Sequence, residues 1–269
     1  MDEKFLHRGE APFGEKVWKA LDDAVIGTAK ANLSARRLLH VDGPYGLGLK
    51  NLPGGEMEVK EAEQADVTVT AAASIAVASV RTSFCLSQRE IAAFEGPGFP
   101  MDLKGAVESA VACARQEDAL VFHGAKALNM PGLLASNGTL SSPLREWTKV
   151  GAAIDDIIKA ATKLDDAGFH GPYALALSPA RYNLLLRKYE CGEMTELDHV
   201  KKLVTDGVVK APPLKAGVLL ATGKEYASIV VGQDLAVGFV GPCAGGYEFT
   251  VSETVALRLV VPETVCVLK

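Results

Sequence analysis

The sequence predicts an α+β fold, because helix-like and strand-like patterns are mixed along the chain without a regular alternation of the two. Apolar residues recur at three- and four-residue spacing in 15–33 and 152–164, which is the period of an amphipathic helix. Short β-like runs dominate the last third of the chain, at 217–221, 227–231, 236–239, 249–252 and 256–261. With 269 residues, of which 48% are hydrophobic, the chain can bury a sizeable core.

Two long helices are predicted in the first half of the chain. The first covers about 15–33, and Pro12 lies just upstream, where a helix tolerates proline. Its apolar stripe consists of Val17, Trp18, Leu21, Val25 and Ala29. A short β-like run follows at 36–41. Asp102 can cap the second helix, whose apolar face starts at Leu103.

The middle of the chain continues with a helix, a strand and a further helix. The helix over 152–164 is followed by a short buried strand at 173–177. Ser178 and Pro179 then place a capping residue before a proline at the first helical position, which predicts a fourth helix. The adjacent acids Asp155 and Asp156 point to different helix faces and are interpreted as surface charge.

The glycine-rich stretch 41–55, VDGPYGLGLKNLPGG, superficially suggests a phosphate-binding loop. Such a loop needs a lysine followed by Ser or Thr and then a helix whose amides meet the phosphates. Here Lys50 is followed by Asn51, and the residues beyond are β-like. We therefore interpret the glycines as a bend in the chain.

Residues 56–84 predict a long two-stranded β arm. Apolar residues alternate with small or polar ones at Val67 and Val69, and again at Ile75 and Val77. An isolated two-stranded hairpin is marginally stable in water, and this one has little with which to build a core. We expect another copy of the chain to cover it.

Residue spacing gives no catalytic or metal-binding constellation. The five histidines include no pair at i, i+4 and no H-E-x-x-H motif, and G-x-S-x-G is absent from the sequence. Cys191 and His199 are close only in sequence, and a solvated loop is the favoured interpretation of this segment. Glu117 and Asp118 with His123 are better explained as a hydrogen-bonded structural network.

Composition also limits partners and location. The net charge is −5 and no Lys/Arg run exceeds two residues, which argues against nucleic-acid binding. The apolar stretch 71–80 is too short to span a bilayer, and the N-terminus has no apolar signal-peptide core, so no membrane association is expected. Five widely spaced cysteines without a C-x-x-C pair are typical of reduced thiols, and we expect a cytoplasmic protein.

Five segments resemble one known family in the same order and with similar gaps. They are ARRLLHVDGPYG (35–46), RTSFCLSQREI (81–91), QEDALVFHGAKALNMPGLL (116–134), GFHGPYALALSPARY (168–182) and VGQDLAVGF (231–239). The chain resembles, over essentially its whole length, the encapsulins, which are bacterial and archaeal nanocompartment shell proteins with the HK97 phage capsid fold. The resemblance implies that the chain self-assembles into an icosahedral homo-oligomer.

The resemblance also assigns a part to each region. It implies an N-terminal helical arm that leads into the P-domain (1–44), an extended E-loop (45–84) and a P-domain with its spine helix (85–134). The A-domain would follow at 135–225, and the final strands at 226–269 would return to the P-domain. The E-loop would pair with a neighbouring subunit, and this pairing would cover the β arm.

Shells of this family take up a cargo enzyme, of the iron-storage or peroxidase type, through its C-terminal targeting peptide. The resemblance places that peptide in a groove between the arm and the P-domain. By matching position, the residues facing the groove would be Val25, Ala29, Leu33, Arg36 and His40, with Asp234 and Leu235 opposite. The alternative is that these side chains form the core of the contact between the arm and the P-domain.

Pores are the second feature that the resemblance implies. The segment YECGEMTELDH (189–199) would form the A-domain tip, and its acids Glu190, Glu193, Glu196 and Asp198 would line a five-fold opening. Repeated by symmetry, they would favour small cations over anions. A solvated acidic loop is the alternative. No cofactor is expected, since Arg89 stands where some encapsulins stack a flavin on tryptophan.

Two rival functions remain from the sequence. A phage-type major capsid protein would share the fold, although the short N-terminal arm favours the nanocompartment. A protease or bacteriocin-like enzyme would require a catalytic constellation, and residue spacing provides none. We therefore expect a shell protein that is not an enzyme.

Overall fold

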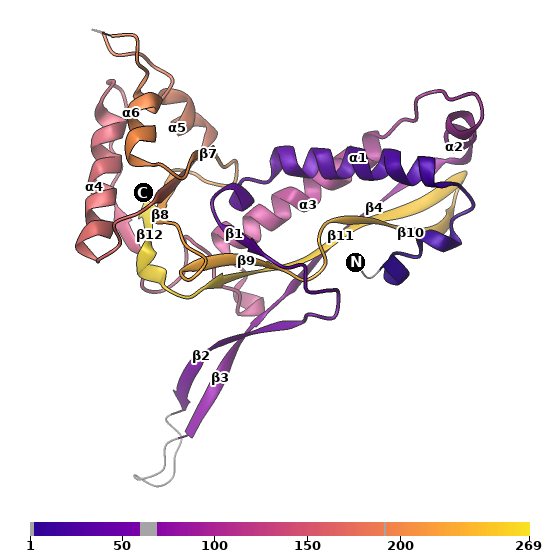
Figure 1. Ribbon diagram of the computed structural model, residues 1–269, viewed down its shortest axis with the longest axis horizontal. Coiled ribbons are helices and arrows are strands. Elements are labelled where there is room, and N and C mark those ends of the chain that lie inside the picture. The colour runs from indigo at the N-terminus through magenta and orange to yellow at the C-terminus, as the bar shows by residue number, and fades with distance from the viewer. Residues whose placement is uncertain (1–2, 60–68, 191) are drawn as a thin grey trace.

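A computed structural model describes residues 3–59, 69–190 and 192–269 of the chain. It consists of two lobes, each built on a β-sheet, and a two-stranded hairpin that projects away from both (Figure 1). The expectations for Val67 and Cys191 lie outside the described residues. Within the described part, no helix is long and apolar enough to cross a membrane.

The larger lobe, which we call the P-domain, is organised by one long strand, β11 (Gly246–Leu259). Along one edge β11 pairs with β4 (Ala78–Ser87), and along the other with β10 (Ala236–Cys243) and then β9 (Ala227–Val231). The short strand β1 (His40–Asp42) completes the sheet in parallel with β9. The sequence predicted two separate strands where β11 runs without interruption.

Helices cover one face of this sheet. The spine helix α3 (Lys104–His123) packs across β4 and β11, and α1 (Glu15–Asn32) lies against α3 (Figure 1). The predicted stripe of α1 is buried, as expected, and an aromatic cluster continues the core beneath it. That cluster contains Phe13, Trp18, Phe84, Phe239 and Phe249. A short helix that periodicity did not predict, α2 (Gln88–Glu95), caps the far end of the lobe.

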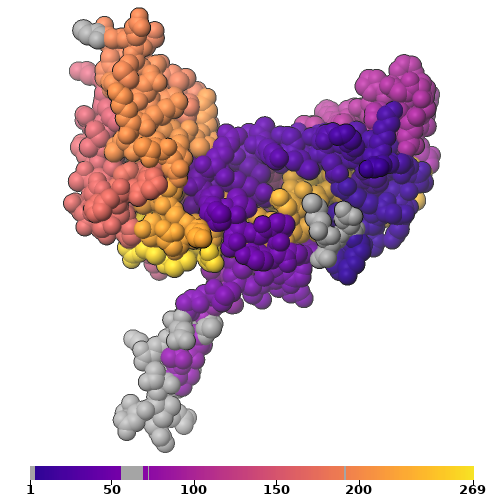
Figure 2. Space-filling view, viewed as in Figure 1, coloured from indigo at the N-terminus to yellow at the C-terminus, as the bar shows by residue number. Residues whose placement is uncertain are grey.

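The N-terminal arm, residues 3–37, includes α1 and three short 3-10 helices. These are η1 (Glu3–Leu6), η2 (Arg8–Glu10) and η3 (Ala35–Arg37). In the space-filling view the arm lies over the P-domain, whereas the hairpin stands clear of both lobes (Figure 2). The arm is therefore an integral part of the P-domain surface.

The projecting hairpin is formed by β2 (Asn51–Val59) and β3 (Val69–Ala76), which pair antiparallel. The predicted arm extended to residue 84, but from Ala78 onward the chain already lies in β4 of the P-domain sheet. The glycine-rich bend is confirmed. Gly43 has φ +122°, and a side chain there would collide with the carbonyl oxygen of Val231, so the turn out of β1 requires glycine.

The smaller lobe, which we call the A-domain, has a five-stranded sheet in the order β5-β12-β8-β6-β7. Its strands are β5 (Leu140–Ser142), β6 (Tyr173–Leu177), β7 (Val208–Lys210), β8 (Gly217–Ala221) and β12 (Val265–Leu268). Its helices are α4 (Ala152–Asp166), α5 (Pro179–Leu184) and α6 (Glu196–Leu203). Two 3-10 turns, η4 (Lys126–Leu128) and η5 (Pro262–Thr264), precede β5 and β12.

The last strand corrects a domain boundary. The resemblance implied that 226–269 belongs to the P-domain, yet β12 pairs with β5 and β8 inside the A-domain sheet. The C-terminus thus ties the two lobes together, because β11 belongs to one sheet and β12, shortly after it, to the other.

Candidate functional site: the joint between the arm and the P-domain

The end of the arm is fastened to the spine helix by a buried aspartate. Asp118 of α3 accepts hydrogen bonds from the backbone amides of Ser34 and Ala35, at 3.0 and 2.9 Å, and from the Ser34 hydroxyl. These amides open η3, so Asp118 caps that turn from another element. Burial raises the pKa of the Asp118 carboxyl, and the three donors counteract the rise.

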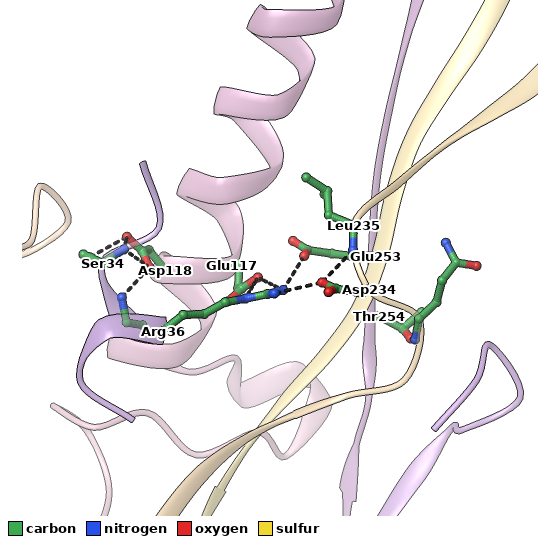
Figure 3. Close-up of polar contacts among 10 residues, drawn as sticks. Ser34, Arg36, Glu117, Asp118, Asp234, Leu235, Glu253 and Thr254 are labelled. Carbon is green, nitrogen blue, oxygen red and sulfur yellow. Dashed lines mark hydrogen bonds and ion pairs between the residues drawn. The ribbon is translucent and has the colours of Figure 1, made fainter. Parts of the chain in front are cut away.

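Arg36 connects three further elements. Its Nε and Nη2 bind the two oxygens of Glu117 on α3, at 2.8 and 2.7 Å (Figure 3). Its Nη1 lies 2.8 Å from Oδ1 of Asp234, in the turn between β9 and β10. Its Nη2 also reaches Oε2 of Glu253 on β11, at 3.1 Å. One guanidinium therefore holds the arm, the spine helix and the sheet in register.

The residues predicted to face a groove divide into two groups. Arg36 and Asp234 meet directly, and His40 is exposed beside the end of the arm. The side chains of Val25, Ala29, Leu33 and Leu235, by contrast, are buried in the core of the P-domain. These four side chains therefore contribute to the contact between the arm and the P-domain within one chain.

An open hollow lies instead at the start of the arm, where periodicity gave no signal. It has a volume of about 670 Å³ between η1 and η2 on one side and β4, β10 and β11 on the other. Phe5 and Val240 line it with 49% and 56% of their surface exposed, and Phe239 forms part of its base. Arg81, Glu10 and Glu248 add charges to its lining.

A second hollow, of about 510 Å³, lies at the end of the arm. Its walls are residues 36–40 on one side and loops of the A-domain, at Pro172, Asp206 and 222–224, on the other. Arg36 and His40, both predicted from the sequence, line this hollow. The arm residues of the first hollow precede α1 in the chain and those of the second follow it, and Arg36 of the joint described above lines the second.

The tip of the A-domain corrects one predicted pore residue. Glu196 is fully buried, and its Oε1 accepts hydrogen bonds from the amides of Gly151, Ala153 and Ile154, at 3.0, 2.9 and 3.1 Å. It therefore accepts hydrogen bonds from the free backbone amides at the N-terminus of α4 instead of lining an opening. Glu190 and Glu193 are exposed. Asp198 is also exposed, although it caps α6 through Thr195.

Other polar residues also have structural partners. Glu117 and Asp118 form the expected network, with Arg36 and Ser34, while His123 binds the carbonyl of Pro213 at 3.1 Å. Asp156, expected at the surface, is buried and accepts from Trp147 and Arg145, so that expectation is wrong.

The remaining candidates for chemistry are dispersed. The His199 ring packs against Tyr189 in a tilted arrangement with centroids 4.8 Å apart, and Arg89 lies exposed in the first turn of α2. Among the described residues, no group of three or more His, Cys, Asp or Glu side chains could hold a metal ion.

The combination of a spine helix on a long sheet, a second sheet lobe and a projecting hairpin is typical of the capsid-type fold. A solved virus-like particle from Pyrococcus furiosus has this fold, with a TM-score of 0.76 at 21% identity over 94% of this chain and 100% of that one. The capsid of Myoviridae phage XM1 is similar with a TM-score of 0.59 at 14% identity, over 84% and 88% of the two chains. The HK97-like fold is therefore confirmed.

Sequence comparison places the chain within this class. A family model described as encapsulating protein for peroxidase matches residues 1–256. The type 1 encapsulin shell protein EncA of Myxococcus xanthus is 34% identical over 98% of this chain and 96% of its own length. The chain belongs to the encapsulin family of shell proteins, which favours the nanocompartment over the phage-capsid and enzyme alternatives.

Proposed function

We propose that copies of this chain assemble into a closed icosahedral shell that encloses a cargo enzyme. The hairpin β2–β3 carries the assembly part of the proposal. It stands clear of both lobes (Figure 1), and a hairpin of two strands needs further packing to be stable in water. A neighbouring copy supplies that packing, which makes the hairpin a link between subunits.

The hollow at the start of the arm is the proposed cargo site. Phe5 and Val240 present apolar surface over Phe239, and Arg81 and Glu10 add charge, which suits a short peptide with apolar anchors and polar flanks. The groove between the arm and the P-domain is retained from the sequence analysis. We place the groove at the start of the arm instead of along α1, because the side chains of Val25, Ala29 and Leu33 are buried against the P-domain.

The end of the arm completes this proposal. Asp234 is 49% exposed at its side chain and lies beside Arg36, and His40 is exposed close by. We place these three at the rim of the surface that the cargo peptide crosses, so the peptide would follow the arm from one hollow toward the other.

The A-domain tip is the proposed pore. Glu190 and Glu193 are exposed there, and Asp198 keeps its charge because hydrogen bonds from Thr195 lower its pKa. A ring of these acids around a symmetry axis would favour cations. Glu196 takes no part. The shell itself would not be catalytic, and the reaction would be that of an enclosed peroxidase or iron-storage protein. We place the shells in the cytoplasm, where buried thiols such as Cys113 would stay reduced.

Light scattering and negative-stain electron microscopy of the purified protein test the assembly. Uniform hollow particles are the expected result, and mass spectrometry of any protein that copurifies then identifies the cargo. A monomer or a small oligomer under native conditions would contradict the proposal.

A further inference from the structure

Two cysteines come together on the sheet of the P-domain. Cys85 lies near the end of β4 and Cys243 is the last residue of β10, and β11 runs between these two strands. The three strands reach the end of the P-domain that is remote from the A-domain (Figure 1). The amide of Gln88 donates to the carbonyl of Gly245 at 3.2 Å, which holds the end of β4 against the β10–β11 turn. The two cysteines therefore flank the same end of β11.

Both cysteine side chains lie on the face of the sheet opposite the spine helix. Cys85 is paired with Glu248 of β11. Cys243 is paired with Gly246, two residues earlier on the same strand. Residues that are paired across strands, or two apart on one strand, share a face of the sheet. Phe84, the neighbour of Cys85, is buried in the core on the other face.

Gly246 leaves the space between the two thiols free. A side chain at this position would collide with the backbone carbonyl of Leu86, so the close approach of β4 to β11 requires glycine. Cys243 lies within hydrogen-bonding range of Cys85, and this hydrogen bond raises the pKa of the Cys85 thiol to about 11. Cys85 is exposed and Cys243 is partly exposed, so a solute can reach both sulfurs.

The separation of the two thiols suits a soft metal ion. A metal that binds two thiolates at about 2.3 Å each holds the sulfurs no more than about 4.6 Å apart, a distance that thiols in hydrogen-bonding range already meet. Thiolates select soft ions such as Cu(I) and Zn(II). Zinc needs at least three protein ligands, and among the described residues no third His, Cys, Asp or Glu completes such a group. Cu(I) is stable with two sulfur ligands, so it is the ion that this pair fits.

We propose that Cys85 and Cys243 form a surface site for one Cu(I) ion per subunit. Both S–H bonds break and two Cu–S bonds form, so two protons pass to solvent and the copper bis-thiolate carries one negative charge. Glu248, paired with Cys85 on the same face, adds negative charge beside the cation. The site requires neither cargo nor a pore, so it stands independently of the proposed function.

Competition for Cu(I) with a chromogenic chelator tests the site. The assembled protein, reduced and kept free of oxygen, is titrated into the Cu(I) complex of bicinchoninate. Cys191 is first replaced by serine, so that this thiol cannot contribute, and the resulting protein serves as the parent. The parent should remove one Cu(I) per subunit from the chelator, and X-ray absorption of the product should show two sulfur ligands.

Substitution of either cysteine should abolish this binding. Cys85→Ser and Cys243→Ser should each lower the affinity by more than about 100-fold, because a lost ligand costs more than a lost supporting partner. Ser83→Ala, at an exposed residue on the same strand and face, is the control and should bind like the parent. Blocking the exposed thiols of the parent with iodoacetamide gives a second test that does not depend on the folding of a variant, and it should also prevent binding.

Two results would overturn the proposal. One is a reduced parent that removes no Cu(I) from the chelator. The other is a parental affinity in Cys85→Ser, in Cys243→Ser or in the alkylated parent, since the copper would then be bound by other groups.

Discussion

Nη1 of Arg36 lies 2.8 Å from Oδ1 of Asp234, a residue 198 positions later in the chain. This ion pair joins the N-terminal arm to the turn between β9 and β10, and the same guanidinium also holds Glu117 of the spine helix. The arm is therefore attached to the P-domain at its C-terminal end by charge and along α1 by apolar packing.

Removing the guanidinium should destabilise the P-domain strongly. Arg36→Ala leaves Glu117 buried without a partner, which costs about 3–5 kcal/mol for a broken buried pair. Thermal unfolding followed by circular dichroism would measure the change. Arg37→Ala is the matched control, since among the described residues that exposed side chain binds only the carbonyls of Lys30 and Ala31. Equal unfolding temperatures for the two variants would contradict the account of the joint.

The buried carboxyl of Glu253 on β11, next to Glu117, should shape the pH dependence of stability. Its pKa is about 10 in the folded protein, compared with an ordinary value of 4.5. Between these values the folded state binds a proton that the unfolded state has released, so this group's contribution to stability falls as pH rises through the window. Glu253→Gln should give a flatter curve of melting temperature against pH from 5 to 9. Parallel curves for variant and parent would refute the assignment.

Glu196 should behave as a helix cap instead of a pore residue. Glu196→Gln removes a negative charge from the N-terminus of α4 and should cost about 1 kcal/mol. Glu193→Gln, three residues earlier and exposed, should leave the melting temperature unchanged. The interpretation fails if Glu193→Gln is the more destabilising of the two.

Passage through the pore should depend on the exposed acids. The double variant Glu190→Gln, Glu193→Gln should slow the entry of a divalent cation and speed the entry of iodide, because an acidic ring attracts the first and repels the second. Quenching of a dye trapped in the shell by Co²⁺ and by iodide would measure both rates. Unchanged rates for both ions would exclude these residues from the pore.

Cargo loading should depend on the hollow at the start of the arm. Val240→Asp places a charge among the apolar lining, and we expect shells that form normally but carry at least tenfold less of the protein that copurifies with the parent. Ile158→Asp, at a similarly exposed aliphatic residue on α4, is the control. If Val240→Asp shells carried as much cargo as the parent, the hollow at the start of the arm would not be the cargo site.

The comparison of sequence with structure shows which interactions periodicity can predict. Each buried residue of the α1 stripe was predicted, because apolar residues spaced at the 3.6-residue period of a helix indicate its buried face. Periodicity cannot tell what covers a buried stripe. The resemblance to encapsulins assigned Val25, Ala29 and Leu33 to a peptide groove, although within this chain they are buried in the core of the P-domain.

Contacts between distant segments were beyond prediction from spacing. Glu196 caps a helix whose first turn lies 43 residues earlier in the chain. Strand β12 pairs within the A-domain sheet, although the preceding strand β11 belongs to the P-domain. The short helix α2 buries only Ile91, so its apolar pattern was too weak to detect. The joint of Arg36 and Asp234 was anticipated in part, and only through the resemblance to encapsulins.

A cryo-electron microscopy reconstruction of the purified particle tests the central claim most directly. The account predicts an icosahedral shell in which the hairpin β2–β3 of one subunit packs on its neighbour, with the arm facing the interior and peptide density beside Phe5 and Val240 in loaded particles. A small oligomer, or a shell with the arm on its outer surface, would contradict it.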